Sequence, residues 1–375
     1  MRKEFQRFGS FMVLLLGTLA CTTPAQPAGA DVVADSATDV HASTKPCGNM
    51  CMATQYCNKT TNKCEDLPCG GPCVTAGDIC RKSTNKCFTP CEGKCTGTQY
   101  CDMSAAATAA DGNCKERAPL PTAWGISGDG KVQKIISLAI ASSNDGCDIN
   151  GDGKPDNNFN RIASLAGSGL SDSIISGQQV LLFEPTGYSS GGTLFTFNML
   201  TGTVDQADAA HDPSTAGGKY TVQRTSYDPA TGEPLVVFAN AKATAGALTA
   251  NAEKFFFNLR IEYNLPTPGI NFALTISKPG VTGTVTDSTS WVDTKKGKVC
   301  GYITQDDLEG AINALPDWTG AGGGMSKVQW LNFLPGVLAP DLDMDGDGVK
   351  ESISVALNLE TASGIVTGVT PPKAP

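Results

Sequence analysis

Twelve of the 15 cysteines lie in residues 47–117 and fall into three blocks of four. The blocks begin at Cys47, Cys69 and Cys91, so each starts 22 residues after the one before. Short words repeat with them: Thr-Gln-Tyr-Cys occurs in blocks one and three, and Thr-Asn-Lys-Cys in blocks one and two. A fixed period of this length indicates an internal repeat of one small structural unit. We therefore define residues 47–117 as a cysteine-rich repeat module.

The N-terminus has the features of an export signal. Arg2, Lys3 and Arg7 precede an apolar run at 11–16, which is much shorter than the ~20 residues that span a bilayer. Thr18-Leu19-Ala20-Cys21 resembles the lipobox of bacterial lipoproteins, although that family usually has Leu where this chain has Thr18. The resemblance implies a signal peptide at 1–20 and a lipid on Cys21, which would anchor the chain in an outer membrane or at the cell surface. The alternative is ordinary secretion, with Cys21 inside the discarded signal.

Export constrains the chemistry of the cysteines. A unit of about 22 residues cannot bury enough apolar surface to fold unaided, so we expect two disulfides in each block. Four cysteines allow three pairings, and the sequence does not choose among them. A zinc cluster is the alternative, but it requires reduced thiolates. Between signal and module, residues 21–46 are rich in Thr, Ala and Asp without periodicity, which predicts a disordered tether. The module itself is expected to be a stalk or a protein-recognition unit.

Residues 118–375 form the remaining domain and are predicted to be mainly β. Apolar and polar residues alternate over 195–198, 257–264, 272–276 and 353–360. Such alternation is typical of antiparallel strands with one buried face, so we expect an antiparallel β-sandwich with small helical insertions. Turns are expected at 228–232 and 278–280. A helix is expected from the capping pair Thr304 and Asp307 to Pro316, with Leu308, Ile312 and Leu315 on one face, and a weaker helix over 159–165.

Two acidic loops in this domain favour calcium. Both place oxygen-bearing side chains at alternate positions, with glycine after the third, and Ca²⁺ prefers six to eight oxygen ligands. The loops resemble those of EF-hand proteins, thrombospondin type 3 repeats and integrin-type propeller repeats. The twelfth position departs from the EF-hand, because Phe159 and Ser354 stand where a bidentate Glu is expected. The predicted ligands are Asp148, Asn150, Asp152, the carbonyl of Lys154 and Asp156 in the first loop, and Asp343, Asp345, Asp347, the carbonyl of Val349 and Glu351 in the second. Asp341 is a candidate extra ligand, or the start of a register shifted by two residues. The alternative is an acidic turn that holds no metal.

Only Cys147 and Cys300 remain outside the repeats and Cys21, so their pairing is the simplest inference. Phe255-Phe256-Phe257 and the four tryptophans are expected in the core, with a sugar-binding platform as the alternative. The domain carries 16 Lys and Arg against 26 Asp and Glu, which argues against nucleic acid as a partner.

No catalytic motif is present, and His211 is the domain's single histidine. We therefore expect a structural or binding role without catalysis. The alternatives are a carbohydrate-binding or adhesion module, and a glycan hydrolase that uses two carboxylates. Expected partners are the membrane, through the lipid, and a surface protein or glycan.

Overall fold

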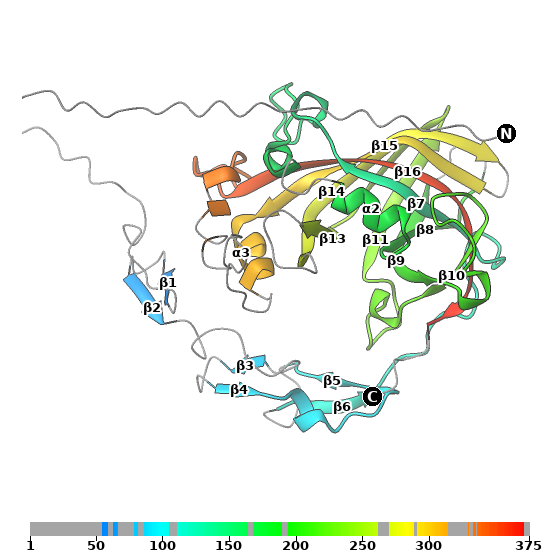
Figure 1. Cartoon of the computed structure of the whole chain (residues 1–375), viewed down its shortest axis with the longest axis horizontal. Helices are drawn as coiled ribbons and strands as arrows, with labels where there is room; N and C mark the ends of the chain where they lie inside the picture. The colour runs from blue at the N-terminus through cyan, green and yellow to red at the C-terminus, as the bar shows by residue number, and fades with distance from the viewer. Residues whose placement is uncertain are drawn as a thin grey trace, which may run out of the picture.

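The C-terminal domain closes into one β-barrel in the computed structural model of the chain (Figure 1). The structure describes residues 55–58, 63–66, 79–81, 86–104, 111–163, 168–189, 194–261, 270–288, 291–313, 329, 333–334 and 336–370. The expected signal at 1–20, the tether at 21–46 and Cys21 lie outside these residues.

Eight antiparallel strands form the barrel wall, and each pairs with its neighbours in a closed ring. In ring order they are β7 Lys131–Ile140, β8 Val180–Thr186, β9 Leu194–Val204, β11 Val236–Thr244, β12 Ala247–Asn251, β14 Ile270–Ser288, β15 Trp291–Thr304 and β16 Ser352–Val369. Two further strands extend the sheet, β10 Gly218–Val222 and β13 Lys254–Ile261. The strands expected at 195–198, 257–264, 272–276 and 353–360 are confirmed over their described residues, within β9, β13, β14 and β16.

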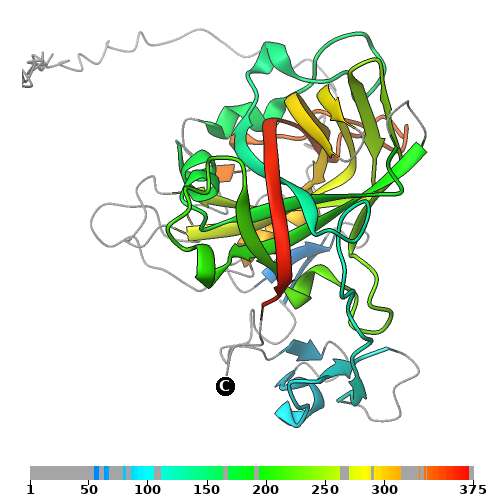
Figure 2. The ribbon, with the colours of Figure 1, turned by 90° about the vertical axis from the view of Figure 1, so that its right-hand side faces the viewer.

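The long strand β16 closes the barrel, and Figure 2 shows it in red on the side of the domain that faces the viewer. Its first half pairs with β15, from Ser352 to Leu359, and its middle pairs with β7, from Leu357 to Ile365. The prediction of a β-sandwich was therefore wrong in architecture, although the mainly β content is confirmed. Alternation shows that one face of each strand is buried, but a sandwich and a small barrel bury it equally well.

Strand β10 adds a second ring outside the barrel. It pairs in parallel with the end of β16 and antiparallel with the end of β9. The buried residues of this ring form their own cluster, which includes Tyr220 and Val366. The larger cluster fills the barrel and continues under the helices. Successive side chains of β8 alternate between the two, since Leu181 joins the larger cluster and Leu182 the smaller.

The expected turn at 278–280 is instead a bulge inside β14. The pairing of β14 with β15 shifts register between Ser277 and Gly280, and Lys278 has a φ of 44°. A bulge absorbs extra residues and bends the strand without reversing the chain. Strand β14 therefore pairs with β12 beyond the bulge and with β13 before it. The other expected turn is confirmed, because the Gly232 amide donates to the Asp228 carbonyl at 2.8 Å.

Phenylalanines from β13 fill the barrel as expected of core residues. Phe255 and Phe257 are buried, and Phe255 contacts Phe238 edge-on with ring centroids 6.4 Å apart. Phe256 faces the other way and stays 36% exposed. Trp124 is also buried, and its indole N–H donates to the Tyr227 hydroxyl at 2.8 Å. The other tryptophan side chains lie outside the described residues. A sugar platform built on Phe255, Phe257 and Trp124 is thereby contradicted.

The described residues include the α-helices α2 Gly169–Ile175 and α3 Gln305–Asn313, which lie in the long connections between strands. Helix α3 is the predicted one: the Asp307 amide donates to the Thr304 hydroxyl at 3.0 Å, and Leu308 and Ile312 are buried. Its predicted end at Pro316 falls outside the described residues. Over the range 159–165 the chain forms the 3₁₀ helix η5 Asn158–Ile162 and Ala163 is α-helical, while residues 164–165 lie outside the described residues. Helix α2 was not predicted. Further 3₁₀ helices in the described part of the chain are η3 Pro90–Gly93, η4 Ser143–Asp145, η6 Gln206–Asp208 and η7 Arg224–Ser226.

Each cysteine block contains one short β-hairpin. The hairpins are β1 Gln55–Asn58 with β2 Lys63–Asp66, β3 Ile79–Arg81 with β4 Lys86–Phe88, and β5 Gln99–Asp102 with β6 Asn113–Glu116. In all three, the third and fourth cysteines of the block stand opposite each other in register. In block three the disulfides are Cys91–Cys101 and Cys95–Cys114, which join first to third and second to fourth. The zinc alternative is excluded for this block, because its four thiols are oxidised.

The shared hairpin register predicts one connectivity for all three blocks. We expect first-to-third and second-to-fourth bonds in blocks one and two as well, because each hairpin sets its third and fourth cysteines at equivalent points. Peptide mapping of the unreduced protein by mass spectrometry would measure this. A first-to-second or first-to-fourth bond in either block would contradict it.

A buried lysine joins β7 to the C-terminal end of α2. The Lys134 side chain is fully buried, and its ammonium donates to the carbonyls of Ile174 at 3.0 Å and Pro213 at 2.6 Å. The position at a helix C-terminus favours a positive charge. Burial nevertheless lowers the pKa of Lys134 to about 8, and the attraction of Asp212 offsets only part of that effect.

This lysine predicts a pH-dependent stability. In the unfolded chain the pKa of Lys134 returns to its usual value of about 10.5, so between pH 8 and 10 the unfolded chain binds more protons than the folded one. The free energy of unfolding should therefore rise by about 1–2 kcal/mol across this window. Above pH 10 the trend should reverse, because burial raises the pKa of Tyr220 and Tyr227 to about 12.

Urea unfolding at a series of pH values would measure the effect. Lys134→Met should flatten the rise between pH 8 and 10. Lys131→Met is the matched control, because Lys131 lies on the same strand and pairs at the surface with Asp129. An equal rise in the wild type and Lys134→Met would refute the assignment.

Candidate metal centre

Both acidic loops lie at the same end of the barrel. The first loop, residues 148–156, follows β7, and the second loop, residues 343–351, precedes β16. Strands β7 and β16 are antiparallel neighbours, and Ile140 near the first loop pairs with Leu357. The connections β7–β8, β9–β11 and β15–β16 all leave from this end, which we call the loop-bearing end. Functional residues concentrate on such connections, because the strands hold them in place.

In the first loop, side chains accept hydrogen bonds from the loop's own backbone. A β-bridge between Cys147 and Asp156 closes the loop at its base. Gly151 and Gly153 have φ values of 79° and 80°, which favour glycine and turn the chain sharply. Four backbone N–H groups donate to side-chain oxygens: Gly153 to Asp148, Asp152 to Asn150, Lys154 to Asp152, and Ile149 to Asp156, at 2.9–3.0 Å.

The second loop repeats this arrangement position by position. Gly346 and Gly348 occupy the equivalent positions with φ values of 79° and 88°. A bridge between Leu342 and Ser352 closes the base. The four equivalent hydrogen bonds are from Gly348 to Asp343, Asp347 to Asp345, Val349 to Asp347, and Met344 to Glu351, at 2.7–3.2 Å. An additional bond runs from Gly346 to Asp343 at 2.7 Å. The two loops therefore have one backbone design.

The carboxylates of the second loop converge. Single oxygens of Asp343, Asp345, Asp347 and Glu351 lie within 4.8 Å of one another. The N–H groups of Gly348 and Gly346 hold the pKa of Asp343 below its usual value, which keeps that carboxylate charged. Among the described residues the first loop forms no such group of three carboxylates. It has one carboxylate fewer, because Asn150 replaces an acid.

Asp341 lies outside this cluster. Both of its oxygens accept hydrogen bonds from Ser354, one from the backbone amide at 2.8 Å and one from the hydroxyl at 2.5 Å. Asp341 is thus held by Ser354 and is not among the converging carboxylates, and its role as an extra ligand, or as the start of a shifted register, stays a prediction. The structure also shows why the residue at the twelfth position of each loop is not a ligand. Phe159 is fully buried against Phe257, and Ser354 belongs to β16, so neither serves as an EF-hand-type ligand.

Two asparagines missed by the sequence reasoning connect the loops. The Asn157 side chain, 7% exposed, donates to the Ala141 carbonyl at 2.7 Å and accepts from the Ala356 amide at 3.0 Å. The next residue, Asn158, donates its backbone N–H to the Ser354 hydroxyl of β16 at 2.7 Å, and its side-chain amide donates to the Ala339 carbonyl at 2.5 Å. The end of the first loop is thus tied to the strand that follows the second. The sequence offered one signal for these asparagines, namely their position directly after the first acidic loop.

Asn157→Ala should destabilise the domain by about 2–3 kcal/mol, because it leaves two buried backbone groups without a partner. Asn251→Ala, at an exposed position on β12, should change the free energy of unfolding by less than ~0.5 kcal/mol. Denaturant titration of both variants would measure the difference. Equal values would show that the Asn157 bonds contribute nothing.

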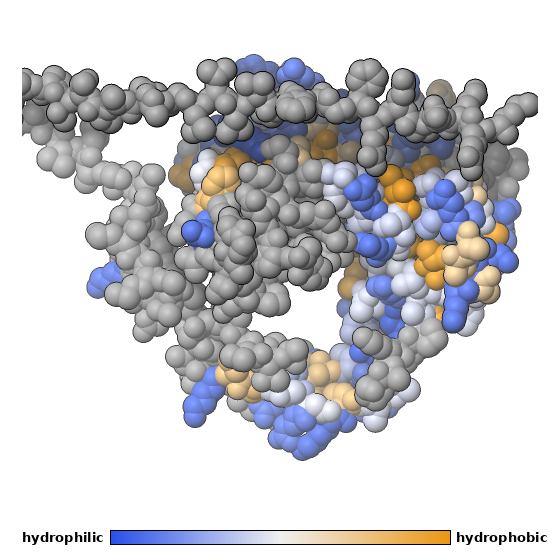
Figure 3. Space-filling view, in the orientation of Figure 1, coloured by the Kyte–Doolittle hydropathy of each residue, from blue (hydrophilic) through white to orange (hydrophobic). Residues whose placement is uncertain are grey.

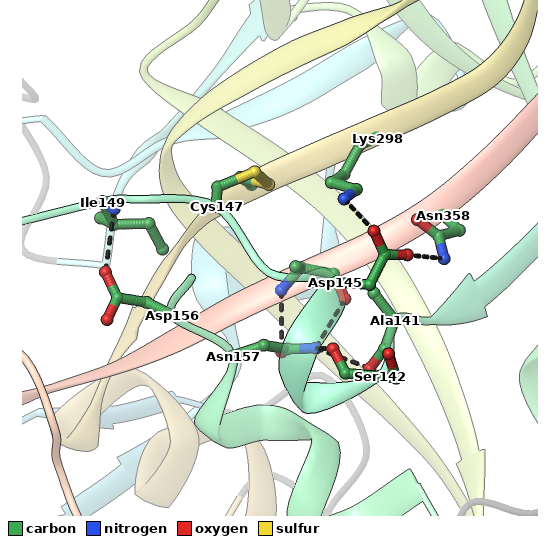
Figure 4. The surroundings of a disulfide bond; sticks show 11 residues. Ala141, Ser142, Asp145, Cys147, Ile149, Asp156, Asn157, Lys298 and Asn358 are labelled. Carbon is green, nitrogen blue, oxygen red and sulfur yellow. Dashed lines mark hydrogen bonds and ion pairs between the residues drawn. A yellow bond between two sulfur atoms is a disulfide. The ribbon is translucent and has the colours of Figure 1, made fainter. Parts of the chain in front are cut away.

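The disulfide between Cys147 and Cys300 fixes the base of the first loop to β15, as the sequence predicts (Figure 4). The bond packs against Ala141 and Ala356. Beside it, Asp145 accepts from the Lys298 ammonium at 2.5 Å and from the Asn358 amide at 2.9 Å. The Lys298 ammonium first, and then Asn358, hold the pKa of Asp145 below its usual value. Covalent and polar contacts together attach the first loop to β15 and β16.

His211 lies in an exposed loop, where its Nε2 is 3.4 Å from the Thr215 carbonyl. No helix among the described residues is long and apolar enough to cross a membrane.

On the face seen in Figure 3, hydrophobic side chains of the described residues are scattered among hydrophilic ones. Comparison with protein-family models, curated proteins and solved structures found no match.

Proposed function

We propose that this chain is an exported, lipid-anchored surface protein in which a disulfide-bonded repeat module carries a calcium-stabilised β-barrel. The observation that carries the proposal is the shared design of the two acidic loops. Both have the same four backbone-to-side-chain hydrogen bonds and the same pair of left-handed glycines. The role of the barrel is structural or binding, without catalysis.

Calcium fits the donor set of the loops. All the side-chain donors are carboxylate or amide oxygens, which a hard cation prefers. The ligands would be Asp148, Asn150, Asp152, the Lys154 carbonyl and Asp156 in the first loop, and Asp343, Asp345, Asp347, the Val349 carbonyl and Glu351 in the second. Without a bidentate Glu at the twelfth position, we expect dissociation constants of ~10⁻⁴–10⁻³ M, the range of extracellular modules.

The ions would act as structural cross-braces. Repulsion among four converging carboxylates of the second loop opposes folding in the absence of a cation. A bound Ca²⁺ removes that repulsion and orders the loop between α3 and β16. Because Asn157 and the Cys147–Cys300 bond join the first loop to β15 and β16, order in one loop supports the other.

The anchor is tested by metabolic labelling with a radioactive fatty acid. In a bacterial host the wild type should incorporate the label and fractionate with the outer membrane. Cys21→Ala should lose the label and, if exported, appear as soluble protein. A labelled Cys21→Ala variant, or an unlabelled wild type, would refute lipidation.

The calcium role is tested separately, by thermal melting of the oxidised protein in calcium, in magnesium and in chelator. The melting temperature should rise in calcium alone, because Mg²⁺ demands a tighter octahedral site and keeps its waters. Equal melting in all three conditions would argue against it.

A further inference from the structure

A pocket of about 190 Å³ lies at the loop-bearing end of the barrel. One wall is formed by the start of β8, the end of β9 and Gln223, which follows β10. The rest of the lining is formed by Phe256, Thr275 and their neighbours on β13 and β14. We call this space the neutral pocket. Its lining residues do not include any residue of the acidic loops.

Among the described residues, those that line the neutral pocket carry no charge, although the domain around it is strongly acidic. Its polar residues are glutamines and threonines: Gln178, Gln179, Gln223, Thr201 and Thr275. Amides and hydroxyls each offer both a donor and an acceptor. A ligand that carries a full charge would find no counter-ion here. A ligand with several hydroxyl groups would find partners of both kinds.

Gln223 and Thr201 already form part of a connected network. The Thr201 hydroxyl donates to Gln223 Oε1 at 3.3 Å and is 2.9 Å from the Ser226 hydroxyl. The Gln223 Oε1 is therefore engaged, while its amide nitrogen donates to no described residue. Gln179 is 8% exposed and is held by contacts of its own. These polar side chains are positioned by the protein before any ligand arrives.

Phe256 supplies an apolar surface at the same place. It stands opposite Thr275 in the β13–β14 register, between two phenylalanines that point into the core. Its ring is 36% exposed, among the most exposed aromatic side chains of the described residues. A ring that borders neutral hydrogen-bonding groups combines one apolar face with polar edges. Such pockets place a few polar groups around apolar walls to orient a ligand.

We propose that the neutral pocket binds an uncharged, hydroxyl-rich ligand, namely a single sugar residue of a glycan. The C–H face of the sugar packs on Phe256, and its hydroxyls bond to the glutamine and threonine side chains. The lining contains no carboxylate, so the pocket binds the sugar and has no pair of acids to cleave a glycosidic bond. This goes beyond the proposed function, because it names a ligand class for the barrel.

Saturation-transfer NMR on the oxidised full chain would test it, with glucose, galactose, mannose and N-acetylglucosamine as probes. Glucuronic acid and glucosamine are charged comparisons of similar shape. At least one neutral sugar should give a saturable signal in the millimolar range, and the charged sugars should bind at least ~tenfold more weakly. No signal from any neutral sugar, or equal binding of the charged sugars, overturns the proposal.

Two variants locate the binding. Phe256→Ala and Gln223→Leu should each lower the affinity for the sugar by about tenfold. The first variant removes a packing surface, and the second removes a hydrogen-bonding side chain. Val237→Ala is the control, because Val237 lies on β11 and is similarly exposed at 38%. Circular dichroism melting verifies that each variant is folded. Unchanged affinity in both folded pocket variants refutes the site.

Discussion

Asp343→Asn should abolish calcium binding by the second loop while the first loop still binds. Asp343 is the residue at which the second loop's contacts converge, since its two oxygens accept from Gly346 and Gly348. It also lies within 4.8 Å of three other carboxylates. An amide removes the charge and replaces one acceptor oxygen with a donor. We expect the affinity of that loop to fall at least ~100-fold, about 3 kcal/mol of binding free energy.

Calorimetric titration of the variant should therefore show one site in place of two. Glu360→Gln is the matched control, because it neutralises an exposed acid on β16 outside both loops. Two sites remaining in Asp343→Asn would show that calcium does not use the second loop. Loss of a site in Glu360→Gln would show that overall charge, and not loop geometry, controls binding.

Removal of the Cys147–Cys300 disulfide should give the largest loss of stability. The bond joins residues separated by 153 positions, and a bridge across so long a segment restricts the unfolded chain strongly. The double variant Cys147→Ala and Cys300→Ala should lose about 4 kcal/mol of unfolding free energy. Alanine is the suitable replacement because the bond packs among alanine side chains. Cys147 adjoins Asp148, so calcium affinity of the first loop should fall as well.

The control for this variant removes Cys91 and Cys101, whose bond closes a separation of only 10 residues within the repeat module. Barrel unfolding, followed by tyrosine and tryptophan fluorescence, should be unchanged in the control. An equal loss in both double variants would mean that the barrel and the repeat module unfold together. No loss in the Cys147 and Cys300 variant would mean that the barrel does not need the bond.

Local features of the fold were readable from the sequence. Strand alternation located β9, β13, β14 and β16, because burial of one face depends only on side-chain parity. The capping pair located α3, because Thr304 and Asp307 interact within one turn. Closure of the sheet was not readable, since it depends on β16 changing partners from β15 to β7. The β14 bulge was not readable either, because a Lys-Pro-Gly sequence is compatible both with a turn that reverses the chain and with a bulge that bends one strand.

The candidate site likewise has local features that the sequence shows and long-range features that it does not show. Each acidic loop carries its candidate ligands within nine residues, so their pattern is visible without a fold. The position of the loops at one end of the barrel is not, because it follows from pairing between β7 and β16. The roles of Asn157 and Asp341 were hidden for the same reason. Their partners, Ala356 and Ser354, lie on a strand whose place only the closed barrel determines.

The central claim is that both loops bind calcium, and isothermal titration calorimetry of the oxidised protein tests it most directly. The account predicts two sites per chain with dissociation constants of ~10⁻⁴–10⁻³ M, absent in chelator and not reproduced by magnesium. It also predicts one site in Asp343→Asn. No calcium-dependent heat, with melting unchanged by chelator, would contradict it and would leave both loops as acidic turns.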